Sequence, residues 1–106
     1  MIEISEVNTL VEYEKLVSDN DKVVLKAGAT WCGPCRVLVN TLKGLDKDKL
    51  NGFIVSEFDV DEDDELTNKL QIRNVPVMFF IINGEIKDKL VGNVTANIIY
   101  DKVKTL

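Results

Sequence analysis

Segments typical of strands and of helices alternate along this chain, and this alternation restricts its possible folds more than any other feature. Two apolar runs, 22–29 and 53–60, have the composition of buried strands. Between them, apolar residues recur at helical spacing from Cys32 to about Leu45. Because strands that are separated by helices tend to pair in parallel, with the helices packed on the sheet, the sequence predicts an α/β fold.

Other segments extend this pattern to both ends of the chain. Before the first apolar run, they predict a short strand at 1–4 and a helix that Asn8 or Thr9 caps and that ends at 18–21. After the second apolar run, they predict a short helix at 63–70, a hairpin of strands 77–82 and 85–91 around Asn83–Gly84, and a last helix that Thr95 caps. The hairpin is expected to add an antiparallel edge to the parallel strands.

Length and charge narrow the class of protein. With 106 residues, of which 45% are hydrophobic, the whole chain 1–106 is expected to form one domain with its own core. The net charge of −5 argues against nucleic acid as a partner, since phosphate binding requires a basic face. The N-terminus has no secretory signal pattern, and the longest apolar run, 75–82, is too short to cross a bilayer. These features predict a cytoplasmic protein without a membrane partner.

The chain has two cysteines, and both lie in the sequence TWCGPC at 30–35. Such a pair can be a redox dithiol, half of a metal site or a structural disulfide. In the cytoplasm, where structural disulfides are rare, a CxxC pair is more often redox-active or metal-bound. Cys32 and Cys35, in a chain without histidine, supply only half of a closed zinc site, so a metal centre would require two chains. We therefore expect no metal site within one chain.

The spacing of the two cysteines suits reversible disulfide chemistry. Residues three apart on a helical turn lie at about the Cα separation of a disulfide. Gly33 lets the chain enter the turn, and Pro34 is tolerated there because its missing N–H would have no helical partner. The helix start would stabilise a Cys32 thiolate, whereas Cys35 falls on the apolar face and is expected to be buried. We therefore expect Cys32 to attack a substrate disulfide and Cys35 to resolve the mixed disulfide.

Four features together resemble the thioredoxin family, and they extend over nearly the whole chain. They are Trp31-Cys32-Gly33-Pro34-Cys35, IRNVP at 72–76, NGEI at 83–86 and Gly92. The resemblance implies a thioredoxin fold, in which a central five-stranded mixed sheet is flanked by four helices and the dithiol lies at the tip of the central strand. It also implies a cis peptide bond before Pro76 and a groove that binds an extended substrate chain by β-augmentation. The implied groove residues are Trp31, Val75, Pro76, Gly92 and Asn93.

The activity that this resemblance implies is that of a protein-disulfide reductase, a thioredoxin-type electron carrier. Its redox group would be the Cys32–Cys35 disulfide itself, with no other cofactor. Electrons would come from an NADPH-dependent flavoprotein reductase, and the protein would act as a monomer on disulfide-containing proteins. The alternative is a binding module or accessory subunit, in which the same surface docks a partner and the dithiol is incidental.

The chain departs from this family at Lys26 and Glu57, where the family usually has a buried aspartate and a lysine, respectively. An isolated charge in the predicted strand 22–29 would be costly to bury, so our hypothesis is a charge-reversed pair of Lys26 and Glu57 beneath the dithiol. A charged Lys26 would stabilise the Cys35 thiolate and make the protein a more oxidising thiol–disulfide oxidoreductase. A neutral Lys26 could instead act as a base, and a Lys26 that reaches solvent would have no chemical role.

An acidic run at 59–70 has aspartates at alternate positions, as in a calcium-binding loop. Its sixth and twelfth positions are Asp64 and Leu70, where an EF-hand loop requires glycine and glutamate. We therefore interpret this run as a solvated acidic turn.

Overall fold

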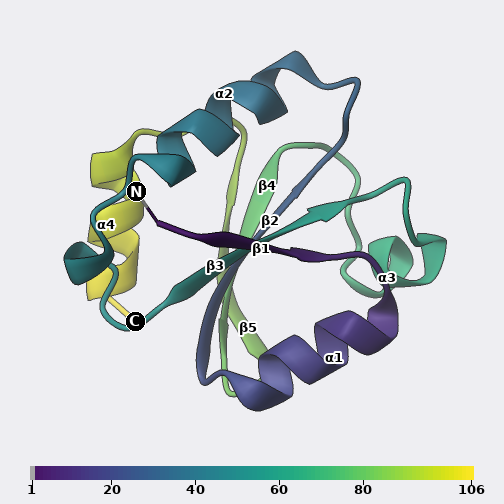
Figure 1. Cartoon of the computed structure of the whole chain (residues 1–106), viewed down its shortest axis with the longest axis horizontal. Helices are drawn as coiled ribbons and strands as arrows, with labels where there is room; N and C mark the ends of the chain where they lie inside the picture. The colour runs from purple at the N-terminus through teal and green to yellow at the C-terminus, as the bar shows by residue number, and fades with distance from the viewer. Residues whose placement is uncertain (1) are drawn as a thin grey trace.

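The computed structural model describes residues 2–106, in which five strands form one sheet between two layers of helices (Figure 1). The strand order is β1-β3-β2-β4-β5. This mixed sheet with four α-helices confirms the predicted fold class. In chain order the elements are β1 (Ile4–Val7), α1 (Leu10–Asp19), β2 (Lys22–Gly28), α2 (Gly33–Lys43), the 3₁₀ helix η1 (Lys47–Lys49), β3 (Ile54–Asp59), α3 (Asp64–Lys69), β4 (Val77–Ile82), β5 (Glu85–Val91) and α4 (Ala96–Lys104).

The helices cover both faces of the sheet. In Figure 1, α2 and α4 lie on one side of the strands, and α1 and α3 lie on the other. Along β2 successive side chains point to alternate faces, so Val24 packs in the core beneath α2 and α4, whereas Val23 and Leu25 pack in the core beneath α1 and α3. Burial on both faces explains why the sequence of β2 is almost continuously apolar. No helix within residues 2–106 is long and apolar enough to span a membrane.

The first strand lies further along the chain than predicted. Of the predicted strand 1–4, Met1 lies outside the described residues, and β1 begins only at Ile4. Its four residues pair in parallel with Val55–Phe58 of β3, and only Val7 is buried. The prediction was wrong because the pairing of this edge strand, rather than its apolar character, sets its limits.

Three strands pair in parallel as predicted, and β4, the first strand of the predicted hairpin, runs antiparallel to β2. β3 ends at Asp59, opposite Gly28, and β4 begins at Val77, opposite Ala27. The connecting segment therefore returns to the same end of the sheet, and the six-residue helix α3 does not take the chain back across it. The antiparallel edge that was expected of the hairpin is therefore confirmed, since β4 pairs antiparallel with both β2 and β5.

Of the two candidate caps for α1, the structure uses Thr9. Its hydroxyl accepts the backbone N–H of Glu12 at 3.1 Å, and the Glu12 carboxylate accepts the backbone N–H of Asn8 at 2.7 Å. The predicted cap of α4 is also confirmed, because the Thr95 hydroxyl accepts the N–H of Ile98 at 3.4 Å. Both helices therefore begin where side-chain oxygens satisfy N–H groups that have no helical partner.

Asp63 joins the starts of two helices on the same face of the sheet. One carboxylate oxygen accepts the N–H of Leu10 at 2.9 Å, and the other accepts the N–H groups of Glu65 and Leu66 at 2.8 and 3.1 Å. Hydrogen bonds from Leu10, Leu66 and Glu65 to the charged form hold the pKa of Asp63 below its ordinary value. The carboxylate thus links the starts of α1 and α3.

This arrangement leads to an expected pH dependence. A carboxyl whose pKa is lower in the folded chain stabilises the fold above its unfolded pKa, and this contribution is lost as the pH falls through the folded pKa. Asp63→Asn should therefore lose less stability than the wild type between about pH 7 and about pH 3, as measured by urea unfolding. Asp64→Asn is the matched control, because Asp64 is exposed and its carboxylate accepts no hydrogen bond within residues 2–106. Equal acid sensitivity in Asp63→Asn and the wild type would show that this carboxylate does not link the helices.

Candidate active site

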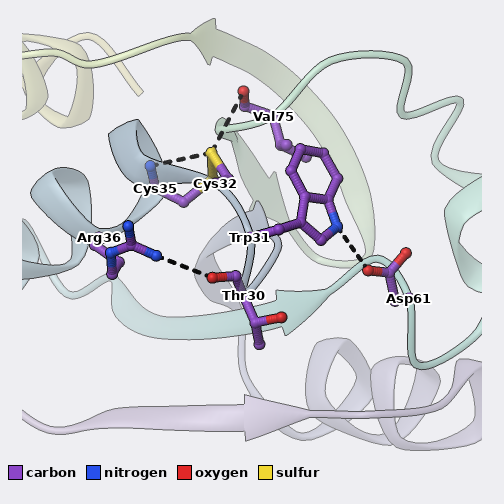
Figure 2. The surroundings of a disulfide bond; sticks show 7 residues. All are labelled: Thr30, Trp31, Cys32, Cys35, Arg36, Asp61 and Val75. Atoms are coloured by element: carbon purple, nitrogen blue, oxygen red, sulfur yellow. Dashed lines mark hydrogen bonds between the residues drawn. A yellow bond between two sulfur atoms is a disulfide. The ribbon is translucent and has the colours of Figure 1, made fainter.

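The Cys32–Cys35 disulfide lies where the chain leaves β2 and enters α2 (Figure 2). Cys32 caps α2, and its Sγ accepts the backbone N–H of Cys35 at 3.2 Å. Gly33 and Pro34 form the first turn, and the Cα atoms of the two cysteines are 5.3 Å apart, within the usual range for a disulfide. The start of the helix therefore directs N–H groups toward Cys32, an arrangement that stabilises a thiolate once the bond is reduced.

The two sulfur-bearing residues differ in their access to solvent. The exposed fraction is 6% for Cys32 and 1% for Cys35, which confirms the prediction of a buried Cys35. Cys32 packs with Ala29 and Val75, and its Sγ lies 3.9 Å from the carbonyl oxygen of Val75. A sulfur that approaches from outside therefore meets Cys32 first.

A peptide bond, a hydrogen bond and a shared cavity connect four of the five residues of the predicted groove. The peptide bond between Val75 and Pro76 is cis, as the family resemblance implied. The Pro76 carbonyl accepts the N–H of Gly92 at 2.8 Å, and the φ of Gly92 is 84°, a left-handed conformation that favours glycine. Trp31, whose side chain is exposed, and Val75 line a cavity of about 290 Å³. Within residues 2–106, the side chain of Asn93 forms no hydrogen bond with the other four.

Two contacts of the site involve residues that the sequence did not identify (Figure 2). The indole Nε1 of Trp31 donates to the Asp61 carboxylate at 2.9 Å, and Nη1 of Arg36 donates to the carbonyl of Thr30 at 3.0 Å. Asp61 belongs to the acidic run that was interpreted only as a solvated turn, so that interpretation was incomplete. No sequence pattern connects it to Trp31, because 30 residues separate the two.

Lys26 and Glu57 are opposite neighbours on β2 and β3, and Glu6 of β1 continues the same row. Side chains in one row point to the same face of a sheet, which here is the face that α2 covers. Within residues 2–106, neither Lys26 nor Glu57 takes part in a salt bridge shorter than 4.0 Å. The charge-reversed pair of our hypothesis is therefore not a direct ion pair in this structure, and both residues instead line one cavity.

That cavity, of about 300 Å³, opens beside Lys26 on the α2 face of the sheet. Its lining includes Gly28, Glu57, Asp59 and Glu62. Only 6% of Lys26 is exposed, and burial lowers the pKa of its amine from the ordinary value, while the attraction of Glu57 and Asp59 opposes this effect. The chain therefore holds a largely buried amine next to the helix that bears the disulfide.

A disulfide on the first turn of a helix, with one sulfur more accessible than the other, can exchange electrons with a second disulfide through a mixed intermediate. This property places the chain in the class of thiol–disulfide oxidoreductases. A sequence model of the family described as Thioredoxin matches residues 4–105. The chain therefore belongs to the thioredoxin family.

Individual relatives agree with this assignment. A thioredoxin of Mycoplasmoides gallisepticum is 33% identical over 93 residues, which cover 88% of this chain and 92% of that protein. The solved structure of a mutant thioredoxin from Halobacterium salinarum is 30% identical, with a TM-score of 0.83 and coverage of 97% of this chain and 89% of that one. A bifunctional thioredoxin reductase/thioredoxin of Mycobacterium leprae is 29% identical over 80 residues, 76% of this chain and 18% of that protein. Together with the cysteine pair, the family identifies this chain as an oxidoreductase that reduces protein disulfides.

Proposed function

We propose that Cys32 and Cys35 divide the reduction of a protein disulfide between them. In the reduced protein, the Cys32 thiolate attacks one sulfur of the substrate, a new bond joins Cys32 to that sulfur, and the other substrate sulfur leaves as a thiolate that takes up a proton. Cys35 loses its proton and attacks Sγ of Cys32, which closes the Cys32–Cys35 disulfide and releases the second substrate thiolate. Two electrons pass to the substrate, and the cysteine pair is the only redox group that this cycle requires.

The observation that supports these roles is the different environment of the two sulfurs. Cys32 is the more exposed residue, and its Sγ accepts an N–H at the helix start. Cys35 is almost completely buried. It can therefore attack only a sulfur that is already held at Cys32, as a resolving cysteine must.

We further propose that the substrate chain binds in extended form along Val75. Main-chain hydrogen bonds to the backbone of this residue would add the substrate to the protein as a short strand, which is a sequence-tolerant way to bind many proteins. The carbonyl of Val75 lies 3.9 Å from Sγ of Cys32, so a chain paired there would hold its own sulfur close to the attacking one. Trp31 supplies an exposed apolar surface, and Pro76, Gly92 and Asn93 complete the proposed groove.

An NADPH-dependent flavoprotein reductase is the electron donor that we propose. The name of the Mycobacterium leprae relative joins a thioredoxin reductase to a thioredoxin in one protein, which supports this choice for a family member. The proposed substrates are disulfide-containing proteins, and the proposed form is a cytoplasmic monomer. A net charge of −5 suits a protein that remains dissolved and unassociated.

Coupled reduction of insulin tests the donor and the activity separately. With dithiothreitol as reductant, a catalytic amount of the protein should accelerate insulin reduction. With NADPH and a panel of flavoprotein thioredoxin reductases in place of dithiothreitol, NADPH should be consumed in proportion to the insulin disulfides that are reduced. Acceleration with dithiothreitol but with none of the reductases would refute the proposed donor, and no acceleration with either would refute the catalytic cycle.

A further inference from the structure

Lys26 is a buried titratable residue that the exchange of disulfides does not itself require. Its side chain is 6% exposed, and within residues 2–106 its amine has no hydrogen-bond partner and no salt bridge. It lies at the centre of the sheet, opposite Glu57 on β3 and Met78 on β4. The amine is not fully enclosed, because Lys26 borders the cavity of about 300 Å³, but a charge on the central strand is still costly to bury, so its place beneath the dithiol requires a reason.

The absence of a side chain at Gly28 makes room for the amine of Lys26. A β-carbon added at position 28 would lie 2.8 Å from Nζ of Lys26 and 3.2 Å from Cβ of Cys35. Both atoms thus border the same small space above Gly28, and they are no more than about 6 Å apart, a range in which one charge affects the ionisation of another group. The absence of a side chain at Gly28 therefore brings the amine of Lys26 close to the resolving cysteine.

The other groups that face Lys26 determine the charge around it. β1 contributes Glu6, β3 contributes Glu57 and Asp59, and the turn after β3 contributes Glu62, all of which line the cavity with Lys26. On the other side, α2 contributes the uncharged Cys35, and β4 contributes the apolar Met78. The carboxylates attract a proton to the amine, whereas burial opposes it. Lys26 is thus the only positive charge among these groups.

We propose that Lys26 is a positioning residue for the resolving step, in which its ammonium stabilises the Cys35 thiolate and makes the Cys32–Cys35 pair more oxidising. This inference rests on the proposed roles of the two cysteines. The thiolate is the form of Cys35 that attacks Sγ of Cys32, so the ammonium increases the fraction of protein that is ready to release its product. The same attraction favours the reduced pair over the disulfide, which has no charge to stabilise. Lys26 keeps its proton throughout, and the bonds formed and broken remain those of the exchange itself.

The matched substitution is Lys26→Met, because methionine fills a similar volume without a charge and its packing should preserve the fold. At a pH above the titration midpoint of Cys35 in both proteins, we expect its equilibrium with a glutathione buffer to shift about tenfold toward the disulfide, which lowers the reduction potential by about 30 mV. Lys22→Met is the control for loss of one charge on the same strand. Lys22 is four residues from Lys26, about 13 Å along β2, which exceeds a screening length of about 8 Å. The reduction potential of Lys22→Met should equal that of the wild type.

A second readout measures the Cys35 thiolate directly. In a Cys32→Ser background, the ultraviolet absorbance of the thiolate is titrated against pH with Lys26 and with Lys26→Met. At any pH well below the midpoints of both titrations, the fraction of Cys35 that is thiolate is expected to be about tenfold smaller with Lys26→Met than with Lys26.

Equal thiolate curves with and without Lys26 would overturn the role of Lys26. So would an equilibrium constant of Lys26→Met with glutathione that lies within about twofold of the wild-type value at a pH above the Cys35 midpoint. An equal shift in Lys22→Met would do so as well. In each of these cases the cysteine pair still cycles. Failure of the pair to cycle in the wild type would instead refute the proposed function.

Discussion

Replacing Cys32 with serine is expected to reduce the rate of protein-disulfide reduction by about a thousandfold or more, to the rate of the reductant alone. A serine hydroxyl is almost fully protonated at neutral pH and cannot form a bond equivalent to the mixed disulfide. Because Cys35 is only 1% exposed, it cannot replace Cys32 in the first attack. The measurement is the initial rate of insulin reduction with dithiothreitol, compared with the wild type and with buffer.

Cys35→Ser is the matched control for this loss, since it removes the second sulfur and leaves the first. This variant should still attack substrate once but should not release it, so a covalent complex with the substrate is expected to accumulate and to dissolve on addition of reductant. Accumulation of the complex in Cys32→Ser instead would reverse the roles of the two cysteines. Full activity of both variants would support the alternative of a binding module with an incidental dithiol.

Leu42→Ala is expected to lower the free energy of unfolding by about 2–5 kcal/mol, the largest loss of stability that we expect from one substitution on α2. Leu42 is completely buried in the core between the sheet and the layer of α2 and α4. Removal of its branched end leaves a cavity that the surrounding strands can only partly fill. The free energy is measured by urea unfolding of the oxidised protein, in which the disulfide remains closed.

Val37→Ala on the same helix is the control, because 57% of Val37 is exposed. A surface substitution of this kind should change the free energy of unfolding by no more than about 0.5 kcal/mol. Similar losses for Leu42→Ala and Val37→Ala would contradict the position of α2 on the sheet, and with it the position of the disulfide.

The parts of the fold that depend on local pattern were predictable from the sequence. The central strand β2 has an apolar sequence because neighbouring strands and helices bury it on every side. The helix caps follow from side chains that lie next to the groups they satisfy, as with Thr9 and Thr95. The limits of β1 were not predictable in this way, because they depend on pairing between segments that are distant in the chain.

The same distinction applies to the candidate site. Cys32 and Cys35 lie one helical turn apart, so their spacing alone indicated that they could form a disulfide. The contact of Trp31 with Asp61 joins a helix start to a turn after another strand, and no local pattern reveals it. For Lys26, the sequence revealed the buried charge, but only the structure shows that its amine and Cβ of Cys35 both border the position of a β-carbon at Gly28.

A redox titration of the wild-type protein tests the central claim most directly. The folded protein is equilibrated with mixtures of reduced and oxidised glutathione, its free thiols are alkylated, and the products are counted by mass spectrometry. The proposed cycle requires one reversible two-electron transition between a form with no free thiol and a form with two, reached from either direction without denaturant. A disulfide that opens only after unfolding, or that does not close again, would contradict the claim that this cysteine pair transfers electrons.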